Sequence, residues 1–189
     1  MYRQFSAADA EDILRSSEGR PTAFRGEQEG HSGRQHLLLS NDELLARYET
    51  KSRQMVHKNG RWKQREFTLI TAFCTLPDMV EAAVLVLNAA QTQNALPDFF
   101  VNTPRQPGMR LEIAFVSPMP FRMRYAQGPS AVRTTMMTDL LMVLDRVDER
   151  PFGLHVQTFF GTLAEISRNS ATLSMANGEK CWSYVVPKS

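Results

Sequence analysis

The chain has 189 residues, 42% of them hydrophobic, which is enough for one domain with a full core and hardly enough for two. Its longest apolar stretch, residues 79–90, is shorter than the ~20 residues needed to span a bilayer, so we expect no membrane partner. The net charge of +2 excludes a chain-wide electrostatic nucleic-acid binder, and two cysteines are too few for a disulfide framework.

Residues 1–29 are polar and mixed in sign, and Gly19, Pro21 and Gly26 interrupt any regular pattern. Only residues 7–14 hint at a short helix. We therefore predict a linker or leader over residues 1–29. No charged region followed by an apolar segment opens the chain at Met1, so no secretory signal is expected.

The first firm element is a helix from Asn41 to about Arg53. Ser40 stands three residues before Glu43, which is the capping-box spacing in which each side chain satisfies the other's backbone N–H. Leucines and a tyrosine beginning at Leu44 then supply the apolar face that such a helix needs.

Basic residues are concentrated on this helix and after it. From Arg47 to Arg65 there are seven basic residues and one acid, a local net charge of +6. Such a segment favours a phosphate-rich partner, because each paired phosphate releases counterions. It is also the pattern of a solvated segment kept soluble by its charges. We expect residues 57–63 to form a loop with Asn59-Gly60 at its turn.

The rest of the chain predicts one more helix and then strands. Thr75 and Pro77 open a helix whose body, residues 79–90, is apolar nearly all round and so belongs in the core. Alternating or β-branched segments predict strands at residues 67–73, 110–116, 121–125, 140–147, 154–160, 171–175 and 180–186. The last two flank Asn177-Gly178, a strong hairpin signal. This order predicts an α+β fold, with a helical N-terminal lobe packed on a twisted antiparallel β-sheet.

Motifs for metal or nucleotide chemistry are missing from the sequence. It contains no HExxH, no CxxC pair, no Walker loop, no GxSxG elbow and no carboxylate cluster placed like a two-metal nuclease site. We therefore expect no metal and no cofactor. Catalysis in such a chain would depend on histidine and arginine together with hydroxyl groups.

Four segments in order resemble the ribonuclease A-like toxin domains of bacterial contact-dependent growth inhibition systems. Residues 30–47 resemble the family's opening, which has two histidines five residues apart and a helix that reads like "eLLaRl". Residues 71–75, followed by the Ala-rich helix, resemble its next motif. Residues 141–144 and 156–160 resemble its final hairpin, so the likeness runs from about Gly30 to Phe160.

The resemblance implies a set of site residues. The family's catalytic histidine and arginine fall on His36 and Arg47, and its closing threonine and aromatic residue fall on Thr158 and Phe160. Additional substrate contacts are expected from His31, Lys51 and His155. Histidine has a pKa suited to proton transfer near neutral pH, and arginine binds phosphate oxygens with two hydrogen bonds.

Each of these residues also has a plainer interpretation. A histidine ahead of a helix is commonly a polar surface residue, and Arg47 has Glu43 four residues before it as a helix-surface partner. Thr158 is a good strand former, and Phe160 could be a core residue. The chain also departs from the family pattern, with Leu38-Leu39 in place of Gly-Lys and Phe160 in place of tyrosine.

The implied function is metal-independent cleavage of single-stranded RNA, with tRNA as a candidate, by 2′-hydroxyl attack that leaves a 2′,3′-cyclic phosphate. The implied partners are RNA and an acidic immunity protein. We expect a monomer that either reaches a target cell's cytoplasm as part of a larger exported protein or is itself cytoplasmic. The alternative is a catalytically inactive member of the fold that binds RNA or a protein.

The implied domain layout is a leader at residues 1–29, a toxin domain at residues 30–160 and a C-terminal β-hairpin extension of the same domain at residues 161–189.

Overall fold

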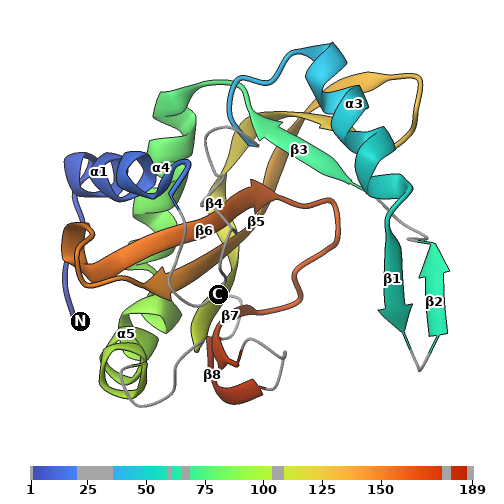
Figure 1. Ribbon diagram of the computed structural model, residues 1–189. Helices are drawn as coiled ribbons and strands as arrows, with labels where there is room; N and C mark the ends of the chain where they lie inside the picture. The colour runs from blue at the N-terminus through green and yellow to red at the C-terminus, as the bar shows by residue number, and fades with distance from the viewer. Residues whose placement is uncertain are drawn as a thin grey trace.

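The computed structural model describes residues 2–20, 36–58, 61–64, 69–103, 109–175 and 180–186. The helices are α1 (Ala7–Ser17), α3 (Asn41–Ser52), α4 (Leu76–Asn88) and α5 (Ala90–Asn102), with a short 3-10 turn at Pro151–Gly153. The strands are β1 (Met55–Lys58), β2 (Arg61–Gln64), β3 (Ile70–Phe73), β4 (Arg110–Ala126), β5 (Val132–Arg146), β6 (Leu154–Gly161), β7 (Asn169–Ser174) and β8 (Lys180–Val186). The predicted α+β class is confirmed (Figure 1).

One six-stranded antiparallel sheet organises the molecule, in the order β6-β5-β4-β7-β8 with β3 also paired to β4. The long strand β4 pairs with β7 through its first residues and with β3 through its last residues. Between these parts the register with β5 shifts, at residues 117–120. Pro118 and Pro120 lie there, and proline cannot donate to a strand ladder, so the sheet changes partners at this point.

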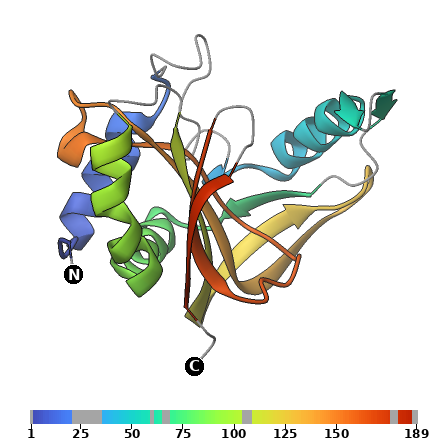
Figure 2. The same cartoon turned by 90° about the horizontal axis from the view of Figure 1, so that it is seen from below.

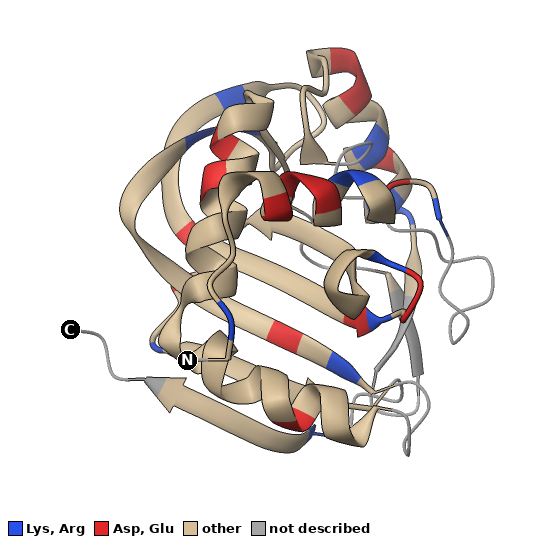
Figure 3. Ribbon diagram, turned by 90° about the vertical axis from the view of Figure 1, so that its left-hand side faces the viewer, with Lys and Arg blue, Asp and Glu red and all other residues tan. Residues whose placement is uncertain are grey.

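The two ends of the sheet are covered differently. Helices α1, α4 and α5 lie against one face, whereas α3 lies apart from them, over β3 and the adjoining ends of β4 and β5 (Figure 2). The main core fills the space between the sheet and helices α1, α4 and α5, and its fully buried side chains include Phe73, Phe99 and Phe159. No helix in the described ranges is long and apolar enough to cross a membrane. On the face seen in Figure 3, acidic and basic residues are interspersed.

The segment that leads into α3 is held by a second, smaller core. Leu39 and Leu44 are buried there against Ile70 and Ala126. Nη1 of Arg124 donates a hydrogen bond of 2.6 Å to the carbonyl of Leu39, which fixes this segment to β4. The predicted capping box at the start of α3 is present, since the Ser40 hydroxyl and the Glu43 carboxylate each accept from the other residue's backbone N–H.

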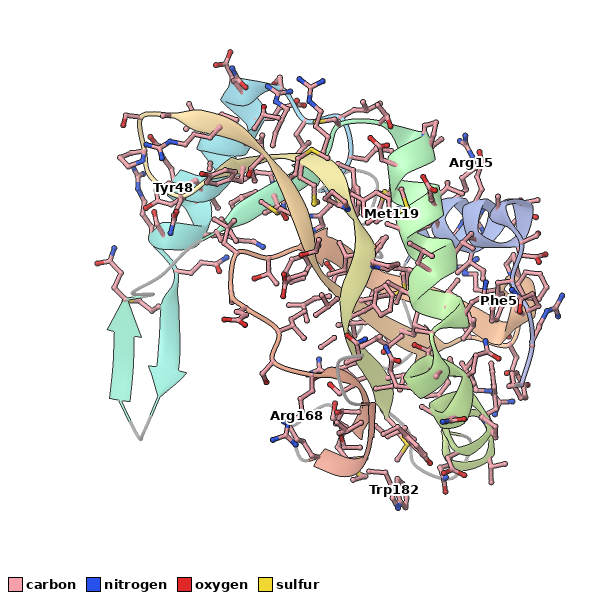
Figure 4. All side chains as sticks on the ribbon, turned by 180° about the vertical axis from the view of Figure 1, so that it is seen from behind. Phe5, Arg15, Tyr48, Met119, Arg168 and Trp182 are labelled. Carbon is pink, nitrogen blue, oxygen red and sulfur yellow. The ribbon has the colours of Figure 1, made fainter. Side chains whose placement is uncertain are left out.

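The prediction of a linker at residues 1–29 is wrong for the first seventeen residues or so. Helix α1 packs on α4 and β6, and Phe5, Ile13 and Leu14 are buried in the main core. The backbone N–H of Val156 donates to the Ser17 hydroxyl at 2.8 Å. Polar residues on the outer side of α1 concealed its narrow apolar stripe in the sequence, whereas Figure 4 shows the helix docked beside α4. Residues 21–29 lie outside the described ranges.

Two further elements differ from the sequence-based prediction. Helix α5 was not predicted because Pro97 lies inside it, and a proline there costs ~3 kcal/mol. Burial of Leu96 and Phe99 offsets this cost, at about 1.5–3 kcal/mol for each side chain. Residues 55–58 and 61–64 form the paired strands β1 and β2, although we expected a loop over residues 57–63; the Asn59-Gly60 turn itself lies outside the described residues.

Candidate active site at the junction of β3 and β6

His36 is positioned by the backbone of β3. The segment after it runs parallel to β3 for a short distance, with a bridge between Leu37 and Phe73. The N–H of Leu38 donates to the carbonyl of Phe73 at 3.0 Å. These contacts bring the imidazole alongside β3, where Nδ1 lies 2.8 Å from the carbonyl oxygen of Thr71.

This contact determines which ring nitrogen can act as a base. A carbonyl oxygen only accepts, so the Nδ1 of His36 must carry the proton that it donates to Thr71. In the neutral ring the other nitrogen, Nε2, is then the unprotonated one. His36 therefore presents a proton acceptor on the side of the ring that faces away from β3.

Thr158 is the residue on that side. Its hydroxyl oxygen lies 3.4 Å from the Nε2 of His36, although 122 residues separate the two in sequence. The two residues that the resemblance assigned to one site therefore lie together. A second bond joins the same strands, because the Thr71 hydroxyl donates to the carbonyl of Gly161 at 2.8 Å.

Phe160 completes the side wall of the site. Its ring stacks on His36 with 5.3 Å between centroids and 26° between planes. It also lines a cavity of about 350 Å³ on the same face of the sheet. His36 itself is only 4% exposed, because Phe160 and Thr158 lie against it.

Leu38 explains one departure from the family pattern. Its φ of 53° lies in the left-handed region that glycine adopts readily and leucine rarely does. The resemblance places a glycine at this position. Leu38 therefore holds a strained backbone conformation while its side chain is 64% exposed.

Arg47 and Lys51 lie one turn apart on α3, and both side chains are half-buried. Burial lowers the pKa of the Arg47 guanidinium from its usual value, although the group stays charged at neutral pH. A half-buried guanidinium is a stronger phosphate ligand than an exposed one, because water competes less. Their contact with phosphate stays a prediction.

For two other residues that were expected to bind substrate, the structure gives no support. His155 is fully buried beside Asp145 in the β5–β6 register, so its side chain offers no surface to a substrate, and that prediction is wrong. It failed because alternation along a strand shows which face a side chain takes but not whether other residues cover it. His31 lies outside the described residues.

Sequence reasoning gave no role to Thr71, although this residue anchors His36 through its carbonyl and the end of β6 through its hydroxyl. Its segment was recognised only as part of a family motif. The anchoring carbonyl belongs to the backbone, which carries no residue-specific signal. Arg110 and Glu112, which line the cavity beside Phe160, were also missed because strand alternation alone does not show which exposed residues gather in one place.

Among the described residues, no group of three or more histidine, cysteine, aspartate or glutamate side chains is arranged to hold a metal ion.

The chain aligns with one from the crystal structure of the CdiA-CT/CdiI complex from Y. kristensenii. The two are 14% identical, and the alignment covers 70% of this chain and 99% of that chain with a TM-score of 0.47. No family model matches the sequence. No curated protein matches it either. A likeness this distant carries no argument about activity, so function is argued from the site.

Proposed function

We propose that this protein is a metal-independent endoribonuclease that cleaves single-stranded RNA by attack of the 2′-hydroxyl on the adjacent phosphate. The observation that supports it most is the orientation of His36. Its Nδ1 is held by the Thr71 carbonyl, and its Nε2 is directed at Thr158 beside a cavity. A fixed tautomer with a directed acceptor nitrogen is what general base catalysis requires.

In the proposed reaction the Nε2 of His36 takes the proton of the 2′-hydroxyl. The 2′-oxygen then bonds to phosphorus while the bond from phosphorus to the 5′-oxygen breaks. The leaving 5′-oxygen takes up a proton from water, and the hydroxide so formed takes the proton held by His36. The products are a 2′,3′-cyclic phosphate and a 5′-hydroxyl. Thr158 donates a hydrogen bond to a phosphate oxygen, and Arg47 stabilises the charge of the phosphorane.

The partners follow from the resemblance and from charge. We propose that tRNA is the first RNA to test, and that an acidic immunity protein binds over the basic cleft, to which the segment from Arg47 to Arg65 contributes a net charge of +6. We also propose that the domain acts inside a target cell after delivery as part of a larger exported protein. A toxin of this kind would be lethal on expression unless its immunity protein is made at the same time.

The experiment is cleavage of labelled total RNA by purified protein in excess EDTA. We expect cleavage by the natural protein, and a loss of at least about a hundredfold in His36→Ala, the range for removing a general base. Arg47→Ala is compared with Arg133→Ala, a matched exposed arginine on β5 that should leave the rate unchanged. Abolition of cleavage by EDTA, or an active His36→Ala, contradicts the proposal.

One observation favours the second candidate, an inactive module that binds RNA or a protein. His36 is 4% exposed under the Phe160 ring, so a phosphate reaches Nε2 only if the contact with Thr158 opens. Two assays, one of RNA binding and one of RNA cleavage, distinguish the two candidate functions. RNA binding without cleavage by the natural protein supports the binding module, whereas cleavage that depends on His36 excludes it.

A further inference from the structure

The sheet face that carries Thr158 and Phe160 continues across three more strands. Strand registers place Thr158 opposite Val143, then Val143 opposite Glu112 and Glu112 opposite Thr172. Neighbouring strands lie ~4.8 Å apart, so the Glu112 backbone is roughly 10 Å from that of Thr158. This is a suitable distance for a nucleotide base whose own phosphate lies at Thr158.

A second row of cross-strand partners lies directly beside the row that runs from Thr158 to Thr172. Phe160 is opposite Leu141, which is opposite Ala114, which is opposite Ser170. Every member of these two rows except Thr158 lines the cavity of about 350 Å³. Ala114 has the smallest side chain of the two rows and makes the hollow, while Phe160 forms the wall shared with His36.

Three charged residues line this cavity: the carboxylate Glu112 and the cations Arg110 and Lys180. The Oε1 of Glu112 is paired with Nη2 of Arg110, and Nε of Arg110 donates to the Ser174 hydroxyl at 3.3 Å. The two side chains are 22% and 35% exposed, so the pair is largely shielded from water. This pairing with Arg110 orients the Glu112 carboxylate. Within the described part of the chain, the hydrogen bonds and ion pairs of Glu112 involve only Oε1, which leaves the lone pairs of Oε2 for a ligand.

We propose that this cavity is a base-recognition subsite that selects guanine in the RNA next to the cleaved phosphate. The inference rests on the proposed function. Guanine presents two neighbouring donors, N1–H and the N2 amino group, to the Glu112 carboxylate, one for Oε2 and one for the remaining lone pair of Oε1. Adenine and cytosine place an acceptor beside their amino group, and uracil flanks its single N–H with carbonyls that Glu112 repels. The apolar ring surface lies against Ala114, Val143 and Phe160.

This arrangement has a measurable consequence for specificity. A well-formed bidentate contact discriminates against the wrong base by about ten- to a hundredfold. RNA should therefore be cut next to guanine in preference to the other bases, and inosine, which lacks the N2 amino group, should be intermediate. Glu112→Gln replaces one acceptor oxygen with a donor and should bring guanine down to the level of the other bases.

The first test measures binding, without catalysis, of guanosine, adenosine, cytidine and uridine 5′-monophosphates to the purified natural chain. We expect the guanosine nucleotide to bind at least about tenfold more tightly than the others. Glu112→Gln should remove that preference. Ala114→Leu, which fills the hollow from a half-buried strand position, should weaken the binding of all four nucleotides. Glu81→Gln on α4 is the matched control and should leave binding unchanged.

The second test measures cleavage of oligonucleotides that differ only in the base beside the cleavage site. Guanine-selective binding without cleavage keeps the subsite and overturns the ribonuclease proposal. Cleavage with no guanine preference contradicts the subsite but not the ribonuclease proposal. The same holds for a guanine preference that is unchanged in both Glu112→Gln and Ala114→Leu. If Glu112→Gln does not fold by circular dichroism, Ala114→Leu decides the result alone.

Discussion

At the scale of single residues, the site depends on backbone atoms as much as on side chains. The Thr71 carbonyl accepts a hydrogen bond from Nδ1 of His36 and so determines the tautomer of that ring. The Thr71 hydroxyl donates to the carbonyl of Gly161. The resemblance assigned His36 and Thr158 to one site, and Nε2 of His36 lies 3.4 Å from the Thr158 hydroxyl. Sequence could not predict the carbonyl that orients the ring, because every residue has one.

Phe160 tests whether the aromatic wall binds substrate. Removing the ring in Phe160→Ala should lower the rate of RNA cleavage about ten- to a hundredfold, because base stacking on an aromatic ring contributes ~1–3 kcal/mol. Phe160→Tyr should keep or raise the rate, since it keeps the ring and adds a donor near the phosphate. Cleavage rate and thermal midpoint are measured together for both variants.

The competing account of Phe160 is a purely structural one. In that case Phe160→Ala costs ~3–5 kcal/mol of stability, and the tyrosine variant is damaged by its buried hydroxyl. A destabilised Phe160→Tyr protein with no gain in rate would show that the ring serves packing alone.

Leu38 offers a test of backbone strain beside the site. Leu38→Gly should raise the free energy of unfolding by about 0.5–1 kcal/mol, because release of ~1–2 kcal/mol of left-handed strain exceeds the ~0.5–1 kcal/mol entropic cost of glycine. Urea denaturation measures this difference. Leu38→Ala is the control, since it keeps the β-carbon and therefore the strain at φ 53°. A Leu38→Gly protein less stable than Leu38→Ala contradicts this account.

At the scale of elements, the sequence predicted best where a local rule acts alone. The capping box at Ser40 fixed the start of α3, and strand alternation identified β6 and β8. Prediction failed where tertiary packing overrides the local rule. The interior Pro97 concealed α5, and the register shift at residues 117–120 made the single strand β4 look like two.

The contact between α5 and β8 gives a prediction about pH. The Tyr184 hydroxyl donates to the Asp98 carboxylate, and this bond raises the pKa of Tyr184 to about 12 from 10.0. A raised folded-state pKa means that the stabilisation is complete below pH 10 and is lost as pH rises from 10 to 12. Tyr184→Phe should therefore be less stable by about 1 kcal/mol at neutral pH, a value limited by solvent screening.

Urea denaturation of the natural protein and of Tyr184→Phe across pH 7–12 checks this prediction. The difference in unfolding free energy between the two should be constant up to about pH 10 and then shrink towards zero. A difference that persists undiminished at the highest pH would mean that the hydroxyl contributes in some way other than through this hydrogen bond.

At the scale of the whole molecule, one sheet carries both the core and the site. Its helix-covered face buries the main core, and its other face presents Thr158 and Phe160 together with the Glu112 cavity. Family order predicted that distant segments meet, because His36 and Thr158 had to build one site. The cavity between β4, β5 and β7 could not be predicted, since it depends on strand registers that sequence does not specify.

The measurement that tests the account most directly is the chemistry of the RNA ends after cleavage in excess EDTA. The natural protein should leave 2′,3′-cyclic phosphates and 5′-hydroxyls, and His36→Ala should leave the RNA intact. Both results follow if the Nε2 of His36 activates the 2′-hydroxyl. Fragments with 5′-phosphates and 3′-hydroxyls, or the same fragments from His36→Ala, would contradict it, because the attacking group would then be water or the base would be another residue.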